Sequence, residues 1–334
     1  MNIDLSTRYL GMQLKNPLVA SAGPLTESLD TLCQLEDAGA AAAVLPSLFE
    51  EQIEHEEVEI HNFYEFQTEA HAESPTYFPE LVGYNHGPDE YLEKIVRAKK
   101  STDIPIIGSL NGWSEGGWVR YAKLIEQAGA DALELNIYFV PTDPMSSAAA
   151  VEQQYSDLVA LVRKSISIPL AVKIGQNFTS LPHFAHQMAA AGADGLVLFN
   201  RFLEADIDLE TLEYRPDLVL SNRHEARVPI RWIGILRDEL KISLAASSGV
   251  HRMNGIVKLL LAGADVTMMT SILLMKGPEH LSTMLNEVEQ WLEQYECDSV
   301  EQLKGSMSRR NCPDPSALER ANYMKALVNY TSPP

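Results

Sequence analysis

Amide side chains stand at the ends of three short apolar runs that are typical of β-strands. Asn111 follows PIIGSL, Asn136 follows ALEL and Asn200 follows GLVLF. An amide carries both donors and an acceptor, so a group of them suits a planar heterocycle edged with carbonyl and N–H groups. A single Asn after a strand is more often a turn residue. The three together indicate the lining of a binding pocket.

A lysine interrupts another apolar run, in LAVKIG. Lys173 stands where this strand should end, and an ammonium there is costly to desolvate unless it faces an anion or an acceptor. Two interpretations are open. Lys173 either contacts a bound molecule or pairs with a carboxylate such as Glu134.

Two further strand ends lead through small and hydroxyl-bearing residues into helices, at SSGVHRMNG (247–255) and TSILLMKG (270–277). Backbone N–H groups at such junctions bind phosphate. The same residues also serve as ordinary helix caps and turns. As an adjacent pair, the two segments favour a phosphate site.

These segments belong to a weak repeat in which a helix end is followed by Gly and an apolar strand. It occurs at 36–46, 126–136, 189–200 and 260–271, and strands with a different entrance lie at 101–110, 165–174 and 240–248. With NPLVASAG (16–23), the pattern predicts eight strands, near 18–23, 42–46, 104–110, 132–136, 169–174, 195–200, 243–248 and 266–271.

Continuous apolar strands separated by helical patterns predict a parallel sheet that is buried on both faces. Eight such units predict an α/β fold of the TIM (β/α)8 barrel type. A doubly wound open sheet is the alternative, but no GxGxxG follows the first strand.

The pattern predicts one domain over residues 1–334, with the barrel at about 3–290. Insertions follow strand two (47–87) and strand six (201–226, a short hairpin and loop), and a helical extension occupies about 298–330. Loops after barrel strands build active sites, so both insertions are candidates for a lid or a pocket wall.

Charge and composition exclude several functions. The formal net charge of -20 disfavours nucleic acid and anionic membranes as partners. No run approaches the ~20 apolar residues needed to cross a bilayer, and the start of the chain does not resemble a leader, so we expect a cytoplasmic protein. Three scattered cysteines provide no metal or iron–sulfur motif.

The chain resembles the dihydroorotate dehydrogenase family, the FMN-binding TIM barrels of pyrimidine biosynthesis, over about residues 3–290. The resemblance rests on the order of NPLVASAG, the Asn of ELN, VKI, the Asn of LFN, SSGV and the TS of TSILLMKG. It implies that Asn136 and Lys173 bind the polar edge of FMN, and that Lys173 stabilises negative charge on the reduced ring. The other implied contacts are Ala20, Ser21, Ala22 and Gly23 beneath the ring, Ser221, Asn222, Ser248, Gly249, Thr270 and Ser271 at the phosphate, and Asn85, Asn111 and Asn200 at the substrate.

The sequence departs from that family at the loop after strand four. The family places a Cys or Ser base there, and in NIYFVP this position falls on or beside Phe139, which cannot accept a proton. Pro141 replaces a substrate-binding Asn. The family's Lys soon after strand two has no counterpart, and Glu50 and Glu51 stand there instead.

The resemblance implies an FMN-dependent oxidoreductase that acts on the CH–CH group of a small cyclic or unsaturated substrate, and the departures leave open whether dihydroorotate is that substrate. Tyr138 is the candidate proton donor, although packing of its ring against the insertion is the alternative, and His86 is another candidate for the missing base. A homodimer and a separate electron-transfer protein are open as partners. Two other functions stay open: a non-catalytic flavin-binding or electron-transfer partner protein, and a flavin-free enzyme that acts on a sugar phosphate.

Overall fold

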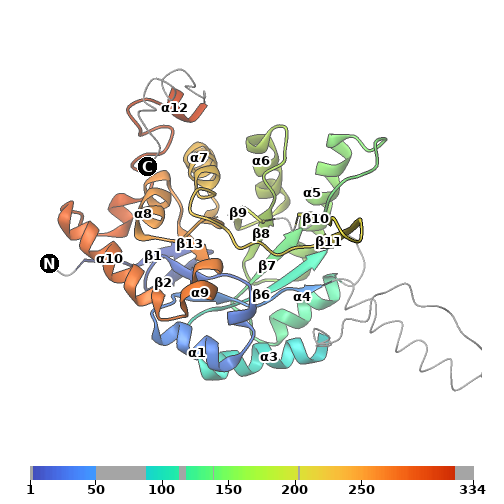
Figure 1. Cartoon of the computed structure of the whole chain (residues 1–334), viewed down its shortest axis with the longest axis horizontal. Coiled ribbons are helices and arrows are strands. Elements are labelled where there is room, and N and C mark those ends of the chain that lie inside the picture. Colours follow the sequence, from blue (N-terminus) through green and yellow to red (C-terminus); the bar gives the residue numbers. More distant parts are fainter. Residues whose placement is uncertain (1–2, 50–87, 113–117, 138, 202–203, 320–334) are drawn as a thin grey trace, which may run out of the picture.

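The computed structural model describes residues 3–49, 88–112, 118–137, 139–201 and 204–319. Within these residues, eight parallel strands form a closed barrel, and helices surround it (Figure 1). The sequence prediction of a TIM-type barrel is confirmed.

The barrel strands follow one another in chain order around the ring. Strand β13 returns to β3, and β4 pairs with β6, which closes the sheet. A two-residue strand, β5 (Leu48–Phe49), pairs with the later part of β6. The eight strands are β3 (Leu18–Ala20), β4 (Ala42–Val44), β6 (Ile106–Gly112), β7 (Ala132–Ile137), β8 (Leu170–Ile174), β9 (Gly195–Leu198), β12 (Ser243–Ala246) and β13 (Val266–Met269).

The helices cover the outside of the barrel and bury an apolar layer against it (Figure 1). They are α1 (Leu29–Asp37), α3 (Pro88–Ser101), α4 (Trp118–Gln127), α5 (Ala148–Ser165), α6 (Leu181–Ala191), α7 (Arg227–Leu236), α8 (Met253–Ala262) and α10 (His280–Gln294), with the short α9 (Ser271–Lys276) after β13.

Alternation along each strand separates two cores. In β7, Leu133 and Leu135 pack in the layer between sheet and helices, whereas Ala132 belongs to the barrel interior. Because side chains of a strand alternate between faces, Glu134 and Asn136 share the interior face with Ala132. The sequence of β7 thus places two polar side chains inside the barrel.

An N-terminal hairpin closes the bottom of the barrel. Strands β1 (Thr7–Tyr9) and β2 (Met12–Leu14) are antiparallel, and Tyr9, Leu10 and Leu14 pack with the interior residues. The N–H of Leu10 donates to Ser243 Oγ, at the start of β12. The sequence analysis did not predict this hairpin.

The glycine repeat has a structural explanation. Gly39, Gly129, Gly192 and Gly263 all have positive φ, between 98° and 121°, as helix ends that turn directly into strands require. In three repeats the Gly-Ala pair is followed by Asp, and each Asp accepts a hydrogen bond from a backbone N–H at the start of the neighbouring strand. The donors are Ile106 to Asp131 (2.7 Å), Leu170 to Asp194 (2.9 Å) and Leu244 to Asp265 (2.8 Å).

The additions to the barrel also follow the prediction. A hairpin of β10 (Ala205–Asp208) and β11 (Glu213–Pro216) lies in the insertion after β9. Near the end of the described chain, α11 (Val300–Leu303) packs on α8, and α12 (Ser316–Glu319) packs on α7. No helix in the described ranges is long and apolar enough to cross a membrane.

Candidate functional site

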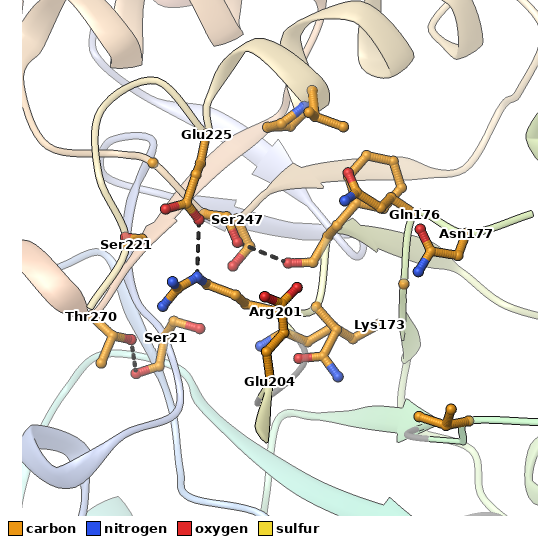
Figure 2. Close-up of a pocket in the computed structure, with 18 of the residues that line it drawn as sticks. Ser21, Lys173, Gln176, Asn177, Arg201, Glu204, Ser221, Glu225, Ser247 and Thr270 are labelled. Carbon is orange, nitrogen blue, oxygen red and sulfur yellow. Dashed lines mark hydrogen bonds and ion pairs between the residues drawn. The ribbon is translucent and has the colours of Figure 1, made fainter. Parts of the chain in front are cut away.

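A cavity of about 1350 Å³ opens at the C-terminal ends of the barrel strands (Figure 2). Its lining comes from the segments after β3, β7, β8, β9, β12 and β13. This is the end of the barrel at which TIM-barrel enzymes place their active sites. Pockets for a single small ligand measure roughly 300–1000 Å³, so the cavity has room for a cofactor and a substrate together.

Lys173 lies at the floor of this cavity and pairs with a carboxylate beneath it. Its Nζ is 3.4 Å from Oε1 of Glu134, and the two side chains are 9% and 1% exposed. Glu134 Oε2 is buried without a hydrogen-bond partner among the described residues. The interpretation that Lys173 pairs with Glu134 is therefore confirmed. Lys173 also lines the cavity, and its contact with a bound molecule stays a prediction.

The amides at the strand ends converge beside this pair. Asn200 Nδ2 donates to Asn136 Oδ1 at 2.9 Å, and Asn136 is in register with Lys173 across β7 and β8. Asn111 is buried and in register with Asn136 across β6 and β7. Asn200 lines the cavity, whereas Asn111 and Asn136 are not among the lining residues.

The loops after β3 and β13 meet at one side of the cavity. Thr270 Oγ1 donates to the carbonyl of Ser21 at 3.3 Å, as Figure 2 shows. A Cβ on Gly23 would lie 2.5 Å from Thr270 Cγ2, so only glycine permits this approach.

The loop after β12 packs equally closely on the segment before α7. Gly249 has φ +74°, and a Cβ there would lie 2.2 Å from the backbone nitrogen of Ala226. This contact brings Ser248 and Gly249 beside Ser221, whose N–H donates to Ser271 Oγ at 3.1 Å. The predicted hydroxyl and glycine residues therefore share one wall of the cavity.

A histidine stands behind this wall. Ser221 Oγ and His251 Nε2 are 2.9 Å apart in a buried hydrogen bond. Burial lowers the pKa of His251, while the negative charge of Glu225 acts in the opposite direction. The segment SSGVHRMNG had marked this loop, but the sequence analysis gave His251 no role.

The structure brings together most of the predicted site residues. Ala20 instead packs in the layer between sheet and helices, and Asn222 is exposed and bonded to Glu225. Asn85, His86, Tyr138, Glu50 and Glu51 lie outside the described residues. The predicted residues that line the cavity are Ser21, Ala22, Gly23, Lys173, Asn200, Ser221, Ser248, Gly249, Thr270 and Ser271.

The lining contains an ion pair that the sequence analysis missed. Arg201 Nε is 2.9 Å from Glu225 Oε2, and Figure 2 shows the arginine side chain directed toward Glu225. The two residues are 24 positions apart within an irregular insertion, so no periodicity could have signalled the contact. Gln176 and Asn177, which follow β8, also line the cavity.

Phe139 and Pro141 both line the cavity, after β7. Neither side chain can transfer a proton. In the described part of the chain, no group of His, Cys, Asp and Glu side chains could hold a metal ion. The polar lining of the cavity therefore consists of amides, hydroxyls, carboxylates and the two cations Lys173 and Arg201, beside apolar residues such as Phe139.

Comparison with known proteins gives a consistent result. A family model described as dihydroorotate dehydrogenase matches residues 81–292. The catalytic subunit of dihydroorotate dehydrogenase B (NAD(+)) from Methanocaldococcus jannaschii is 25% identical over 306 residues, 87% of this chain and 94% of the relative. The same subunit from Thermoplasma acidophilum is 25% identical over 309 residues (90% and 98%), and that from Bacillus cereus is 24% identical over 316 residues (92% and 98%).

Proposed function

The chain belongs to the dihydroorotate dehydrogenase family, and on that premise we propose that it is an FMN-dependent oxidoreductase acting on the CH–CH group of a small cyclic or unsaturated substrate. The observation that carries the proposal is the buried Lys173, which faces the cavity beside hydrogen-bonded amides. An ammonium in this position would serve no purpose in a barrel that only needed to be stable, because desolvating it is costly.

The cavity fits FMN in its size and in its polar groups. Gly23 and Gly249 let their loops pack closely on Thr270 and on Ala226, and both loops carry hydroxyls that line the cavity. Ser221, Ser248 and Thr270 supply hydroxyl groups for a phosphate on that wall. Lys173 and the amide of Asn200 supply donors for the carbonyl edge of a flavin ring.

FMN held here would exchange a hydride with the substrate: it would take the hydride as a CH–CH group loses H⁻ and H⁺, and return it when an alkene is reduced and receives the proton from an acid. The ammonium of Lys173 would stabilise negative charge at the polar edge of the ring, and Glu134 holds this ammonium in place from below. Asn200 is oriented by its bond to Asn136 and would present its remaining amide groups to the ring or the substrate.

Proton transfer needs a group other than Phe139 or Pro141. We retain Tyr138 as the candidate donor, with His86 as the alternative, and both stay predictions. Tyr138 directly follows β7, and a phenol with a pKa near ~10 is a suitable acid for protonating a carbon centre in alkene reduction.

The proposal is tested by purifying the chain, recording its absorption spectrum and titrating the apoprotein with FMN. We expect stoichiometric binding and bands near ~370 and ~450 nm, which are typical of an oxidised flavin cofactor. Lys173→Met should retain FMN but lower its reduction potential, because the cation favours the reduced ring. Lys123→Met is the matched control, since Lys123 is exposed on α4.

Two outcomes would contradict the proposal. A chain that binds no FMN would favour the flavin-free sugar-phosphate enzyme. A chain that binds FMN but is not reoxidised by any organic acceptor after reduction would favour a non-catalytic flavin protein. Adding dihydroorotate without oxygen then tests the family's own substrate, since bleaching of the flavin would show that another group replaces the missing base.

A further inference from the structure

Acidic side chains dominate the charged lining of the cavity. The only cations among the described lining residues are Lys173 and Arg201. The acids are Asp143, Glu152, Glu204, Asp206, Asp217 and Glu225.

Both cations are already neutralised within the protein. Lys173 pairs with Glu134 at 3.4 Å, and Arg201 pairs with Glu225 at 2.9 Å. A third cation, Arg215 of the hairpin, pairs with Asp208 at 3.5 Å and is not a lining residue. An anion that entered the cavity would therefore have to compete for a cation that already has a carboxylate partner.

The remaining acids come from two segments of the lining. Glu204, Asp206 and Asp217 belong to the hairpin insertion after β9, and Asp143 and Glu152 follow β7. Across the described residues, no ion pair joins any of these five to a cation. Ser248, Thr270 and Ser271, which we propose for the phosphate, follow β12 and β13 instead.

Two segments outside the described residues, 50–87 and 113–117, contain no lysine or arginine in the sequence. The first contains many glutamates and four histidines, which become cationic only in acid.

We propose that this cavity selects an uncharged or cationic substrate and rejects carboxylates, dihydroorotate included. The inference rests on the proposed function and specifies its substrate class. One uncompensated charge several ångströms away, at the effective dielectric of a protein surface, is enough to change an encounter by about tenfold. Five carboxylates in the lining, four of them exposed and open to screening by salt, therefore disfavour an anionic ring over its neutral counterpart at low ionic strength.

The test uses reduced holoprotein and three artificial electron acceptors of different charge: ferricyanide (anionic), benzoquinone (neutral) and hexaammineruthenium(III) (cationic). Each reduced flavin loses two electrons, so it reduces one quinone to the hydroquinone or two of either metal complex. Oxygen is excluded, and every rate is divided by the rate with free reduced FMN. The normalisation removes differences in the intrinsic reactivity of the acceptors.

At low ionic strength we expect the normalised rate with ferricyanide to be at least about tenfold below that with hexaammineruthenium(III), with benzoquinone between them. Raising the salt concentration should bring the three rates together, because it screens the carboxylates. The double variant Glu204→Gln/Asp217→Asn should reduce the discrimination. The control is Glu287→Gln/Glu289→Gln, on the outer helix α10. It removes the same net charge and should leave the discrimination between the acceptors unchanged.

The reduction potential of the bound flavin is a second readout that does not depend on turnover. Reduction adds negative charge to the ring, so removing Glu204 and Asp217 should raise the potential, and the control on α10 should not. Ferricyanide that reacts as fast as the cation, independently of salt, would overturn the inference. Fast bleaching by dihydroorotate that becomes faster as salt is removed would also overturn it. Failure to bind FMN would instead overturn the proposed function on which the inference rests.

Discussion

The carboxylate of Glu134 lies 3.4 Å from the ammonium of Lys173, and both groups are enclosed by the barrel. Their positions follow from register, since Glu134 is two residues before Asn136 on β7 and Asn136 pairs with Lys173 on β8. Strand alternation then directs all three side chains to the interior. The pair fixes the ammonium at the cavity floor, where a mobile lysine would otherwise extend to solvent.

Replacing one member of this ion pair should lower the free energy of unfolding more than replacing both. Glu134→Gln leaves a buried ammonium without its counter-charge, and Lys173→Met leaves a buried carboxylate, so each should destabilise the apoprotein by about 3 kcal/mol. The double variant Glu134→Gln/Lys173→Met should recover much of that loss, because no isolated charge remains. Urea unfolding of the four proteins measures the coupling. Additive losses would show that the two groups do not stabilise one another.

Gly249 should be intolerant of any side chain. Gly249→Ala places a Cβ 2.2 Å from the nitrogen of Ala226, in a backbone with φ +74°, so the loop must move away from Ser221. We expect a loss of stability above the ~1–2 kcal/mol that left-handed backbone alone costs, and weaker FMN binding.

The matched control for that change is Gly129→Ala. Gly129 also has positive φ, +98°, but a Cβ there would meet nothing within 4 Å. It should therefore show only the backbone cost and unchanged FMN affinity. Thermal unfolding and FMN titration check both variants. Equal effects at the two positions would show that the close approach at Gly249 is unimportant.

The sequence could predict those parts of the site that follow from strand periodicity and strand order. Asn136, Lys173 and Asn200 were predictable because they end strands, and strand ends converge in a parallel barrel. The interpretation that Lys173 pairs with Glu134 was also correct. Glu134 is in register with Ala171, two residues before Lys173 on the neighbouring strand, so the two side chains share the interior face and lie within reach. These inferences need only periodicity and strand order.

Other features depend on contacts that the periodicity of the sequence does not predict. The N-terminal hairpin has strands of only three residues, and its turn places Leu10 at φ 50°, an unusual conformation for leucine. Arg201 and Glu225 meet across an irregular insertion, and His251 meets Ser221 from a different loop. In each case the partner is chosen by tertiary packing, so the sequence alone could show the residue but not the contact.

The stability of the protein should fall in mild acid partly through His251. Burial lowers the pKa of His251 in the folded state, so the unfolded chain binds a proton more readily. Stability from this residue is therefore fully present above the unfolded pKa of about 6.5 and is lost as the pH falls from there through the folded pKa. His251→Gln should be less sensitive than the wild type between pH 7.5 and 5.5.

Unfolding midpoints in urea at a series of pH values measure this difference. His183→Gln is the control, because His183 is exposed on α6. If His251→Gln and the wild type lose stability in parallel, the hydrogen bond between His251 and Ser221 must survive protonation of the ring. The histidine would then donate to the hydroxyl in both charge states, and the pH dependence would come from other groups.

The three repeat aspartates should differ in their importance although they make the same hydrogen bond. Asp265 is 7% exposed and contacts two cations, Lys304 at 3.0 Å and Arg237 at 3.1 Å, whereas Asp131 and Asp194 are 30% and 48% exposed and pair with one cation each. Asn substitutions keep the hydrogen-bond acceptor but remove the charge. Asp265→Asn leaves the 3%-exposed Lys304 with Glu301 as its remaining ion-pair partner, and we expect it to cost about 2 kcal/mol.

The corresponding changes at the two exposed positions should cost much less. Exposed ion pairs contribute about 0–1 kcal/mol, so Asp194→Asn should cost least, with Asp131→Asn between the extremes. Urea unfolding of the three single variants gives the order directly. Similar losses of unfolding free energy at all three positions would mean that the hydrogen bond to the neighbouring strand, and not the charge, is the stabilising contribution of each aspartate. A large loss at Asp265 alone would show that burial determines how much each aspartate contributes.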